Sequence, residues 1–346
     1  MVIVMHSGAS REQLDHVVQR VKHLGLKTHI TTGKGKSIIG VIGDTTEIDT
    51  GTFMPLPGVE RVERVSSPYK LASREPNGKL LRSNTVVSVG NVPIGGNDII
   101  IIAGPCAIEG EAQIATIAHA VRGAGANILR GGAFKPRTGP YNFQGLGLSG
   151  LEMLQTTGRS VGMPTITEVM SPQQVGLVVQ YVDILQIGAR NMQNFDLLKE
   201  VGKSGKPVML KRGMAATIDE WLLAAEYILS EGNSKVMLCE RGIRTFDDQY
   251  SRNVLDVMAV PIVKTLSHLP VLVDPSHGTG RKELVLPGAI AAIVAGADGV
   301  MIEVHHDPES ARCDSQQALL PEEFKKLMCQ LTKVAEAIGR NVCKSY

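Results

Sequence analysis

The sequence predicts an α/β protein in which a (β/α)8 TIM barrel follows a small N-terminal ferredoxin-like domain of βαββαβ order. From residue 97, strand-length apolar runs alternate with amphipathic helical stretches eight times in about 250 residues, as an eight-stranded barrel requires. These runs are continuously apolar, which indicates strands buried on both faces. Residues 1–66 follow a different order, in which strands outnumber helices. A doubly wound open sheet is the alternative, but its glycine-rich dinucleotide-binding motif is missing.

The small domain, residues 1–66, is expected to contain four strands and one clear helix. Its middle strands are joined by a turn at Gly33–Gly35, and a poor helix or loop with Pro55 and Pro57 precedes the last strand. The expected strands are 2–5, 26–32, 36–43 and 59–65, and the expected helix is 11–24.

Residues 67–84 are polar and contain two prolines, so we expect a linker there. The barrel domain then spans 85–346 and opens with a β-hairpin at 85–96 that turns at Gly90–Asn91. The clearest helical stretches are 112–123, 219–230, 283–295 and 321–339. The expected barrel strands are 98–104, 127–132, 164–168, 183–188, 207–213, 235–242, 271–277 and 299–305.

Composition and charge exclude several functions. The chain has 36 Lys and Arg against 34 Asp and Glu and only 4% aromatic residues, which argues against a nucleic-acid-binding surface. No apolar run reaches the roughly 18 residues of a membrane helix, and the start MVIVMHSG lacks the basic region of a signal peptide. The five cysteines form no CxxC pair, as expected of a reduced cytoplasmic protein.

Nearly every predicted barrel strand ends in a reactive or charged side chain. The carboxyl ends of barrel strands meet at one rim, where active sites lie. Charged groups at the ends of buried strands are costly unless they bind a ligand or pair with each other. In chain order these residues are Cys106, Arg130, Glu168, Arg190, Lys211 with Arg212, Arg241, Asp274 with His277, and Glu303.

The cations of this rim predict anionic substrates. Grouped at one mouth they would repel each other, and Arg and Lys suit phosphate and carboxylate recognition. The alternative is a set of salt bridges to Glu168, Glu240 and Glu303. The cations are Arg130, Lys135, Arg137, Arg190, Lys211, Arg241 and Arg244.

A metal site is expected from Cys106, His277, Glu303 and Asp314, because such a donor set suits Mn, Fe, Zn or Co. Spacing alone leaves three rival ligands open, which are His305, His306 and Asp307.

Seven motifs at these residues resemble the 3-deoxy-D-arabino-heptulosonate 7-phosphate (DAHP) synthases, over residues 85–340. The domain in front resembles the regulatory domain of the type Iβ branch. Some relatives carry an all-helical chorismate mutase domain there, which the strands of residues 1–66 exclude. The motifs are AGPCAIE (103–109), LRGGAFKPRTGPYNFQGLG (129–147), QIGARNMQNFDLL (186–198), MLKRG (209–213), CERGIRTF (239–246), LVDPSHGTGR (272–281) and IEVHHDP (302–308).

The resemblance implies a (β/α)8 barrel with an N-terminal hairpin and the first reaction of the shikimate pathway. In that reaction phosphoenolpyruvate (PEP), D-erythrose 4-phosphate and water give DAHP and phosphate. The family depends on a divalent metal, for which we expect Mn²⁺, with Fe²⁺, Zn²⁺ or Co²⁺ as alternatives. Family barrels are commonly homotetramers.

The resemblance also implies residue roles. The metal ligands would be Cys106, His277, Glu303 and Asp314. Glu168 would support water or neighbouring cations near PEP, Asp274 would lie beside the aldehyde, and Lys135 would act as general acid or by its charge alone. PEP would be held by Arg130, Lys135, Arg190, Lys211 and Arg241, and the phosphate of erythrose 4-phosphate by Arg137 and Thr138.

The sequence departs from the family pattern at three places. Gly139 replaces a serine that helps to bind the aldose phosphate, and His306 replaces a usual proline. Cys313 precedes Asp314 where serine is usual, and it is either an oxidation-sensitive neighbour of the metal or a surface thiol. None of these changes removes a predicted metal ligand.

Two other functions remain to be compared. The 3-deoxy-D-manno-octulosonate 8-phosphate synthases join PEP to arabinose 5-phosphate, but they have KANRSS-like residues where this chain has KPRT, so Arg137 favours the DAHP interpretation. A non-catalytic regulatory protein is opposed by the complete set of predicted metal ligands.

The resemblance to the type Iβ branch also implies a regulatory site in the small domain, which would bind tyrosine or phenylalanine between subunits. His29 and Thr31 match the effector region of that branch.

Overall fold

The computed structural model describes residues 1–33, 36–45, 48–64, 68–74, 82–137 and 139–344. The chain divides into two compact units, which are considered separately. The first contains Met1–Lys70, and the second contains the chain from residue 82 onward. Among the described residues, no helix is long and apolar enough to cross a membrane.

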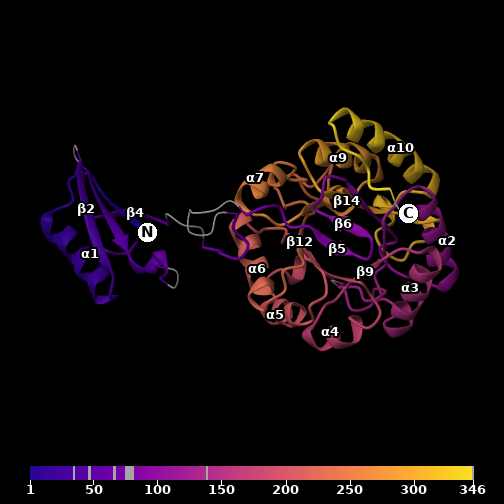
Figure 1. Ribbon diagram of the computed structural model, residues 1–346, viewed down its shortest axis with the longest axis horizontal. Coiled ribbons are helices and arrows are strands. Elements are labelled where there is room, and N and C mark those ends of the chain that lie inside the picture. Colours follow the sequence, from indigo (N-terminus) through magenta and orange to yellow (C-terminus); the bar gives the residue numbers. More distant parts are fainter. Residues whose placement is uncertain (34–35, 46–47, 65–67, 75–81, 138, 345–346) are drawn as a thin grey trace. The chain divides into compact units, whose positions relative to one another are not determined.

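The first unit is an antiparallel sheet of order β2-β3-β1-β4, with α1 on one face (Figure 1). Ser10 begins α1 through a capping box with Gln13, and the buried side chains of Val17 and Val21 face the sheet. Residues 34–35 of the predicted turn Gly33–Gly35 lie outside the described residues. The elements are β1 (Val2–Met5), α1 (Arg11–His23), β2 (Lys27–Gly33), β3 (Lys36–Ile42) and β4 (Val59–Glu63).

The poor helix or loop predicted before β4 is a single 3-10 turn, Thr50–Thr52. Asp49 caps it by accepting a hydrogen bond from the Gly51 amide. Pro55 and Pro57 follow at once and prevent a longer helix, because proline lacks the amide hydrogen that the helix needs. Phe53 is fully buried and anchors the turn to the core of the unit.

The second unit is a closed barrel of eight parallel strands, ringed by helices (Figure 1). Every strand is buried along its whole length, as the continuous apolar runs predict. The strands are β7 (Ile100–Gly104), β8 (Ile128–Arg130), β9 (Thr165–Glu168), β10 (Ile184–Ile187), β11 (Val208–Lys211), β12 (Val236–Glu240), β13 (Val271–Val273) and β14 (Gly299–Glu303).

This unit contains nine helices within the described residues. They are α2 (Glu111–Gly123), α3 (Leu148–Val161), α4 (Pro172–Val178), α5 (Phe195–Lys203), α6 (Ile218–Ser230), α7 (Ala259–Leu266), α8 (Pro275–Thr279), α9 (Lys282–Val294) and α10 (Pro321–Ala337).

One barrel strand is much shorter than predicted. Residues 271–277 were expected to be a single strand, but β13 ends at Val273 and α8 begins at Pro275. Asp274 caps this helix by accepting a hydrogen bond from the His277 amide at 2.9 Å. Pro275 occupies the first helical position, where its missing N–H costs nothing. His277 therefore lies on a helical turn above the rim rather than on a strand.

The hairpin consists of β5 (Val87–Val89) and β6 (Val92–Ile94). Its four buried side chains pack in one cluster with inward-facing barrel residues, including Ile100 and Met209. The hairpin thus closes the amino end of the barrel and leaves the carboxyl end open for a site.

Candidate active site

A cavity of about 570 Å³ opens at the carboxyl ends of the barrel strands. Its walls include the ends of β8, β9 and β11 and the loops after β10, β12 and β13. The predicted residues on its lining are Arg130, Lys135, Arg137, Glu168, Arg190, Lys211, Arg241, Arg244, His277 and Asp314.

Cys106, His277, Glu303 and Asp314 meet at this end, with one ligating atom of each within 4.8 Å of the others. Cys106 Sγ lies 3.1 Å from Asp314 Oδ2 and 3.7 Å from His277 Nε2. His277 Nε2 also lies 3.6 Å from Glu303 Oε2. The rival ligands His305, His306 and Asp307 are absent from this group; of these, His305 lies near Glu109, with Nε2 3.7 Å from Oε2.

Neighbouring side chains fix these donors. Asp274 Oδ2 lies 2.8 Å from His277 Nδ1, which leaves Nε2 directed at the cluster. Gln317 donates a 2.6 Å hydrogen bond to Glu303 Oε2, and the Glu303 amide donates to Ser276 Oγ at 3.0 Å. The backbone of Asp314 is in the left-handed region, at φ 54°, and turns its carboxylate toward Cys106.

The electrostatics of the cluster favour a bound cation. Burial raises the pKa of Glu303 well above its usual range, and Cys106 adds to this shift. The hydrogen bond with Cys313 and burial raise the pKa of Cys106 to about 12. Burial opposes ionisation of Asp314, but His277 and Cys106 hold its pKa below the usual value. A divalent ion would relieve the crowding of these acidic groups.

The cations of the cavity have unused hydrogen-bond donors. Arg130 and Arg241 are buried, and Nη1 of each has no hydrogen-bond partner among the described residues. Nε of Arg137 is likewise unpaired within that part of the chain. Buried donors without partners are costly, so these groups fit an anionic ligand. Arg130 also forms a 3.7 Å salt bridge with Glu303. Among the described residues, no other lysine or arginine of the cavity pairs with the three glutamates Glu168, Glu240 and Glu303 of the salt-bridge alternative.

Lys135 and Lys211 already have partners. The Lys135 ammonium donates to the Cys106 carbonyl and Sγ, both at 3.0 Å. Lys211 contacts the fully buried Asp274. Arg212, the neighbour of Lys211, is not on the cavity lining and pairs with Glu240 at 3.1 Å. The ion pair of Arg212 and Glu240 therefore has a structural role.

The predicted effector residues lie in the first unit. His29 and Thr31 are exposed on β2 of the first unit, opposite Gly40 and Ile38 of β3. Thr138 lies outside the described residues.

Sequence reasoning missed several cavity residues, and it left two alternatives open for Cys313. Arg252 contacts Asp314 at 3.3 Å from a loop after β12, where no strand end signals its role. Gln186 faces the cavity from β10 and could have been found from strand alternation. Cys313 is not a surface thiol, because its side chain is buried against Cys106 and Phe143.

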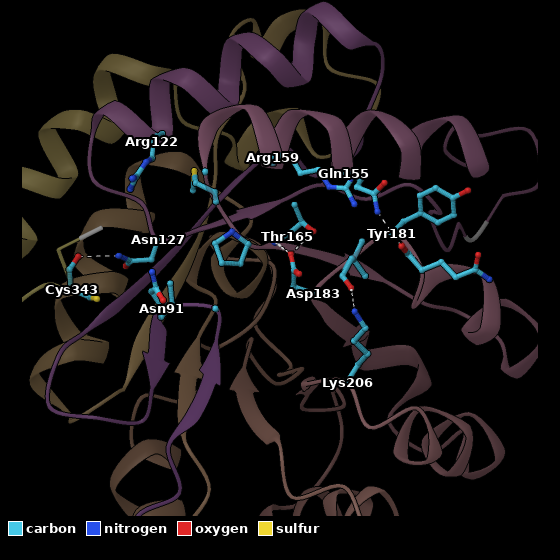
Figure 2. Close-up of a pocket in the computed structure, with 18 of the residues that line it drawn as sticks. Asn91, Arg122, Asn127, Gln155, Arg159, Thr165, Tyr181, Asp183, Lys206 and Cys343 are labelled. Carbon is cyan, nitrogen blue, oxygen red and sulfur yellow. Dashed lines mark hydrogen bonds between the residues drawn. The ribbon is translucent and has the colours of Figure 1, made fainter. Parts of the chain in front are cut away.

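A second cavity, of about 690 Å³, lies at the amino end of the barrel (Figure 2). Several of its polar groups bond to each other, as Figure 2 shows. Asp183 accepts a 2.8 Å hydrogen bond from the Thr165 amide, and Lys206 donates to the Val182 carbonyl at 2.9 Å. The smaller cavity, with its unused donors and ligand cluster, is therefore the candidate active site.

Comparisons with known proteins agree with this geometry. The DAHP synthetase I family matches residues 80–340, and the DAHP synthase ferredoxin-like domain matches residues 1–67. A Thermotoga maritima phospho-2-dehydro-3-deoxyheptonate aldolase is 47% identical over 342 residues, 99% of this chain and 100% of the relative. A crystal structure of DAHP synthase from that organism has a TM-score of 0.92 and covers 99% of both chains.

More distant relatives bear the name of the rival function. A 2-dehydro-3-deoxyphosphooctonate aldolase of Desulfatibacillum aliphaticivorans is 35% identical over 274 residues, 74% of this chain and 99% of the relative. The full-length match and both family matches confirm the predicted resemblance. The chain belongs to the DAHP synthetase I family, as a DAHP synthase with an N-terminal ferredoxin-like domain.

Proposed function

We propose that the chain condenses PEP with D-erythrose 4-phosphate and water, and releases DAHP and phosphate in the cytoplasm as the first step of the shikimate pathway. One observation carries the proposal: a single cavity joins metal-ligating side chains to buried cations with unused N–H groups. Both substrates are phosphate esters and PEP also has a carboxylate, so their charges complement those cations.

The donor set of Cys106, His277, Glu303 and Asp314 fits a divalent transition metal, because it combines a soft sulfur, an imidazole and two carboxylates. We expect Mn²⁺, with Fe²⁺, Zn²⁺ or Co²⁺ as alternatives. When bound there, the ion supplies Lewis-acid polarisation of the aldehyde oxygen.

The buried cations bind PEP in this proposal. Arg130 and Arg241 have the free donors needed to hold phosphate or carboxylate oxygens. The further members of the set are Lys135, Arg190 and Lys211. Asp274 is fully buried between Lys211 and His277, so we assign it the role of a positioning residue for both.

The reaction joins C3 of PEP to the aldehyde carbon, and water adds at C2 before phosphate leaves by C–O cleavage. Glu168 lines the cavity and is the carboxylate that supports this water. Burial opposes the charge on Lys135, but Cys106 and Glu168 hold its pKa above the usual value. In the proposed reaction Lys135 acts as a general acid or by its charge alone.

Arg137 and Thr138 hold the phosphate of erythrose 4-phosphate. Arg137 is partly buried on the cavity wall and donates to the Arg312 carbonyl, which orients its guanidinium. Asn142 Nδ2 lies 3.3 Å from where a side chain at Gly139 would begin. We assign this amide the polar contact that the usual serine makes.

Phosphate release from PEP tests the proposal. Parallel reactions contain Mn²⁺ and either erythrose 4-phosphate or arabinose 5-phosphate, with and without a chelator. We expect chelator-sensitive release with erythrose 4-phosphate alone. Preference for arabinose 5-phosphate would favour the octulosonate function, and release with neither aldose would favour a regulatory protein.

We also propose that residues 1–66 bind tyrosine or phenylalanine as a feedback inhibitor in a homotetramer. Support comes from the match of residues 1–67 to the ferredoxin-like domain of DAHP synthases. His29 and Thr31 present adjacent side chains on the same face of β2, where both are exposed to an effector.

A further inference from the structure

The two sulfur atoms of Cys106 and Cys313 lie 3.4 Å apart at the wall of the active site. Both side chains are buried, and Phe143 packs against the pair. Cys106 follows β7, whereas Cys313 is in the loop before α10, so the barrel brings together thiols that are far apart in the sequence. A disulfide requires the sulfurs to approach to about 2.0 Å, which is a small movement from this starting point.

Each sulfur also has its own cationic neighbour. Lys135 Nζ lies 3.0 Å from Cys106 Sγ, and Arg137 Nη1 lies 2.9 Å from Cys313 Sγ. Both cations line the 570 Å³ cavity. A small solute that touches Lys135 or Arg137 in the cavity is therefore next to a side chain that contacts one of the sulfur atoms.

The other three cysteines lack this arrangement. Cys239 is buried on β12 and donates to the carbonyl of Glu240, while Cys329 is exposed on α10. Cys343 is partly buried and donates to the carbonyl of Lys344. Among the thiols of the described residues, Cys106 and Cys313 are the one pair whose sulfur atoms are in contact.

We propose that Cys106 and Cys313 form a site of reversible oxidation, at which hydrogen peroxide closes a disulfide and removes Cys106 from the metal cluster. The sulfur of Cys313 attacks one peroxide oxygen, the O–O bond breaks, and water leaves, giving a sulfenic acid. Cys106 then attacks that sulfur, the S–S bond forms, and the S–O bond breaks with loss of a second water. Two thiols are oxidised and one peroxide is reduced.

The consequence for metal binding rests on the proposed function. A sulfur in a disulfide is no longer a thiolate ligand, so the oxidised protein keeps three of the four donors and binds the ion more weakly. Conversely, a bound ion occupies Cys106 and slows closure. At a Mn²⁺ concentration about ten times its Kd, we expect roughly tenfold slower crosslinking.

Peptide mapping of the full-length, metal-free protein after treatment with hydrogen peroxide tests the site directly. The five cysteines fall on five different tryptic peptides, so each pairing has a distinct mass. We expect peptide 83–122 to be joined to peptide 313–325, and free thiols to fall from five to three and return to five with dithiothreitol.

Two variants define the chemistry. C313S keeps an oxygen acceptor for Arg137 and should form no crosslink, whereas C329S, at the exposed thiol, should crosslink like the parent. In C106S the sulfenic acid on Cys313 has no thiol to resolve it, so dimedone should label peptide 313–325. A parent protein in which Cys106 reaches sulfinic acid without the crosslink, or an equal crosslink in C313S, would overturn the proposal.

Equilibrium dialysis with Mn²⁺ separates this proposal from the proposed function. The reduced protein should bind the ion, and the crosslinked protein should bind it at least about tenfold more weakly, as for other losses at a metal site. Crosslinking in a protein that binds no Mn²⁺ when reduced would refute the metal site and leave the thiol pair standing. Unchanged binding after crosslinking would refute the claimed effect of oxidation on the metal.

Discussion

Replacing Asp274 with Asn tests how the metal ligand His277 is held. Asp274 is fully buried, and its carboxylate caps α8, contacts Lys211 and lies 2.8 Å from His277 Nδ1. Asparagine has nearly the same shape and can still accept the hydrogen bond of the helix cap. The substitution therefore removes the charge while the turn that carries His277 stays in place.

The expected cost follows from these contacts. Loss of one partner from a buried ion pair costs about 3–5 kcal/mol, because Lys211 is left buried and uncompensated. Loss of the group that orients a metal-binding histidine lowers metal affinity about 10–100-fold. We therefore expect D274N to unfold at a lower temperature and to bind Mn²⁺ about 10–100-fold more weakly, as measured by thermal unfolding and equilibrium dialysis.

Asp298 provides the matched control at the amino end of the barrel. It is buried, pairs with Lys264 at 2.7 Å and accepts a hydrogen bond from the Val271 amide at 2.8 Å. D298N should destabilise the barrel without changing the affinity for Mn²⁺. The reasoning is refuted if D274N binds Mn²⁺ like the parent, or if D298N weakens binding to the same extent.

Three further predictions concern the substrates and the regulator. In G188A the added Cβ would lie 2.0 Å from Glu168 Oε1, so we expect a displaced carboxylate and a reduced kcat; a normal kcat would contradict the role of Glu168. In R137A the KM for erythrose 4-phosphate should rise while the KM for PEP stays constant, because a charged hydrogen bond contributes about 1.5–3 kcal/mol; equal changes in both would argue against a separate aldose site. Deleting residues 1–66 should abolish inhibition by tyrosine or phenylalanine and preserve turnover in steady-state assays, and retained inhibition would place the effector elsewhere.

Much of the fold could be predicted because buried parallel strands are continuously apolar. That signal marks β7 and β14 clearly; Glu303 is the last residue of β14, and Cys106 follows the end of β7 by two residues. The signal fails at the end of β13, because the apolar run stops at Val273 and the polar residues DPSH (274–277) follow. Pro275 has no amide hydrogen to donate to a neighbouring strand, so β13 ends before it. An aspartate directly before a proline is typical of a helix start and indicates the short helix α8.

The site was predictable where its residues follow strands and unpredictable where they lie on loops. Arg130 and Glu303 end their strands, and the rim of a barrel brings such positions together. Arg252 reaches the site from a loop and Gln317 from the short 3-10 helix Ser315–Gln317, and the position of both depends on packing between distant segments. The burial of Cys313 has the same origin, because it depends on contacts with Cys106 and Phe143 that local sequence does not encode.

Anomalous diffraction at the manganese edge, from crystals grown with Mn²⁺ and PEP, tests the central claim most directly. That claim is that one cavity holds both a metal and an anionic substrate. We expect a peak among Cys106, His277, Glu303 and Asp314, with PEP on the free donors of Arg130 and Arg241. A peak at His305, or PEP bound in the cavity at the amino end of the barrel, would contradict it.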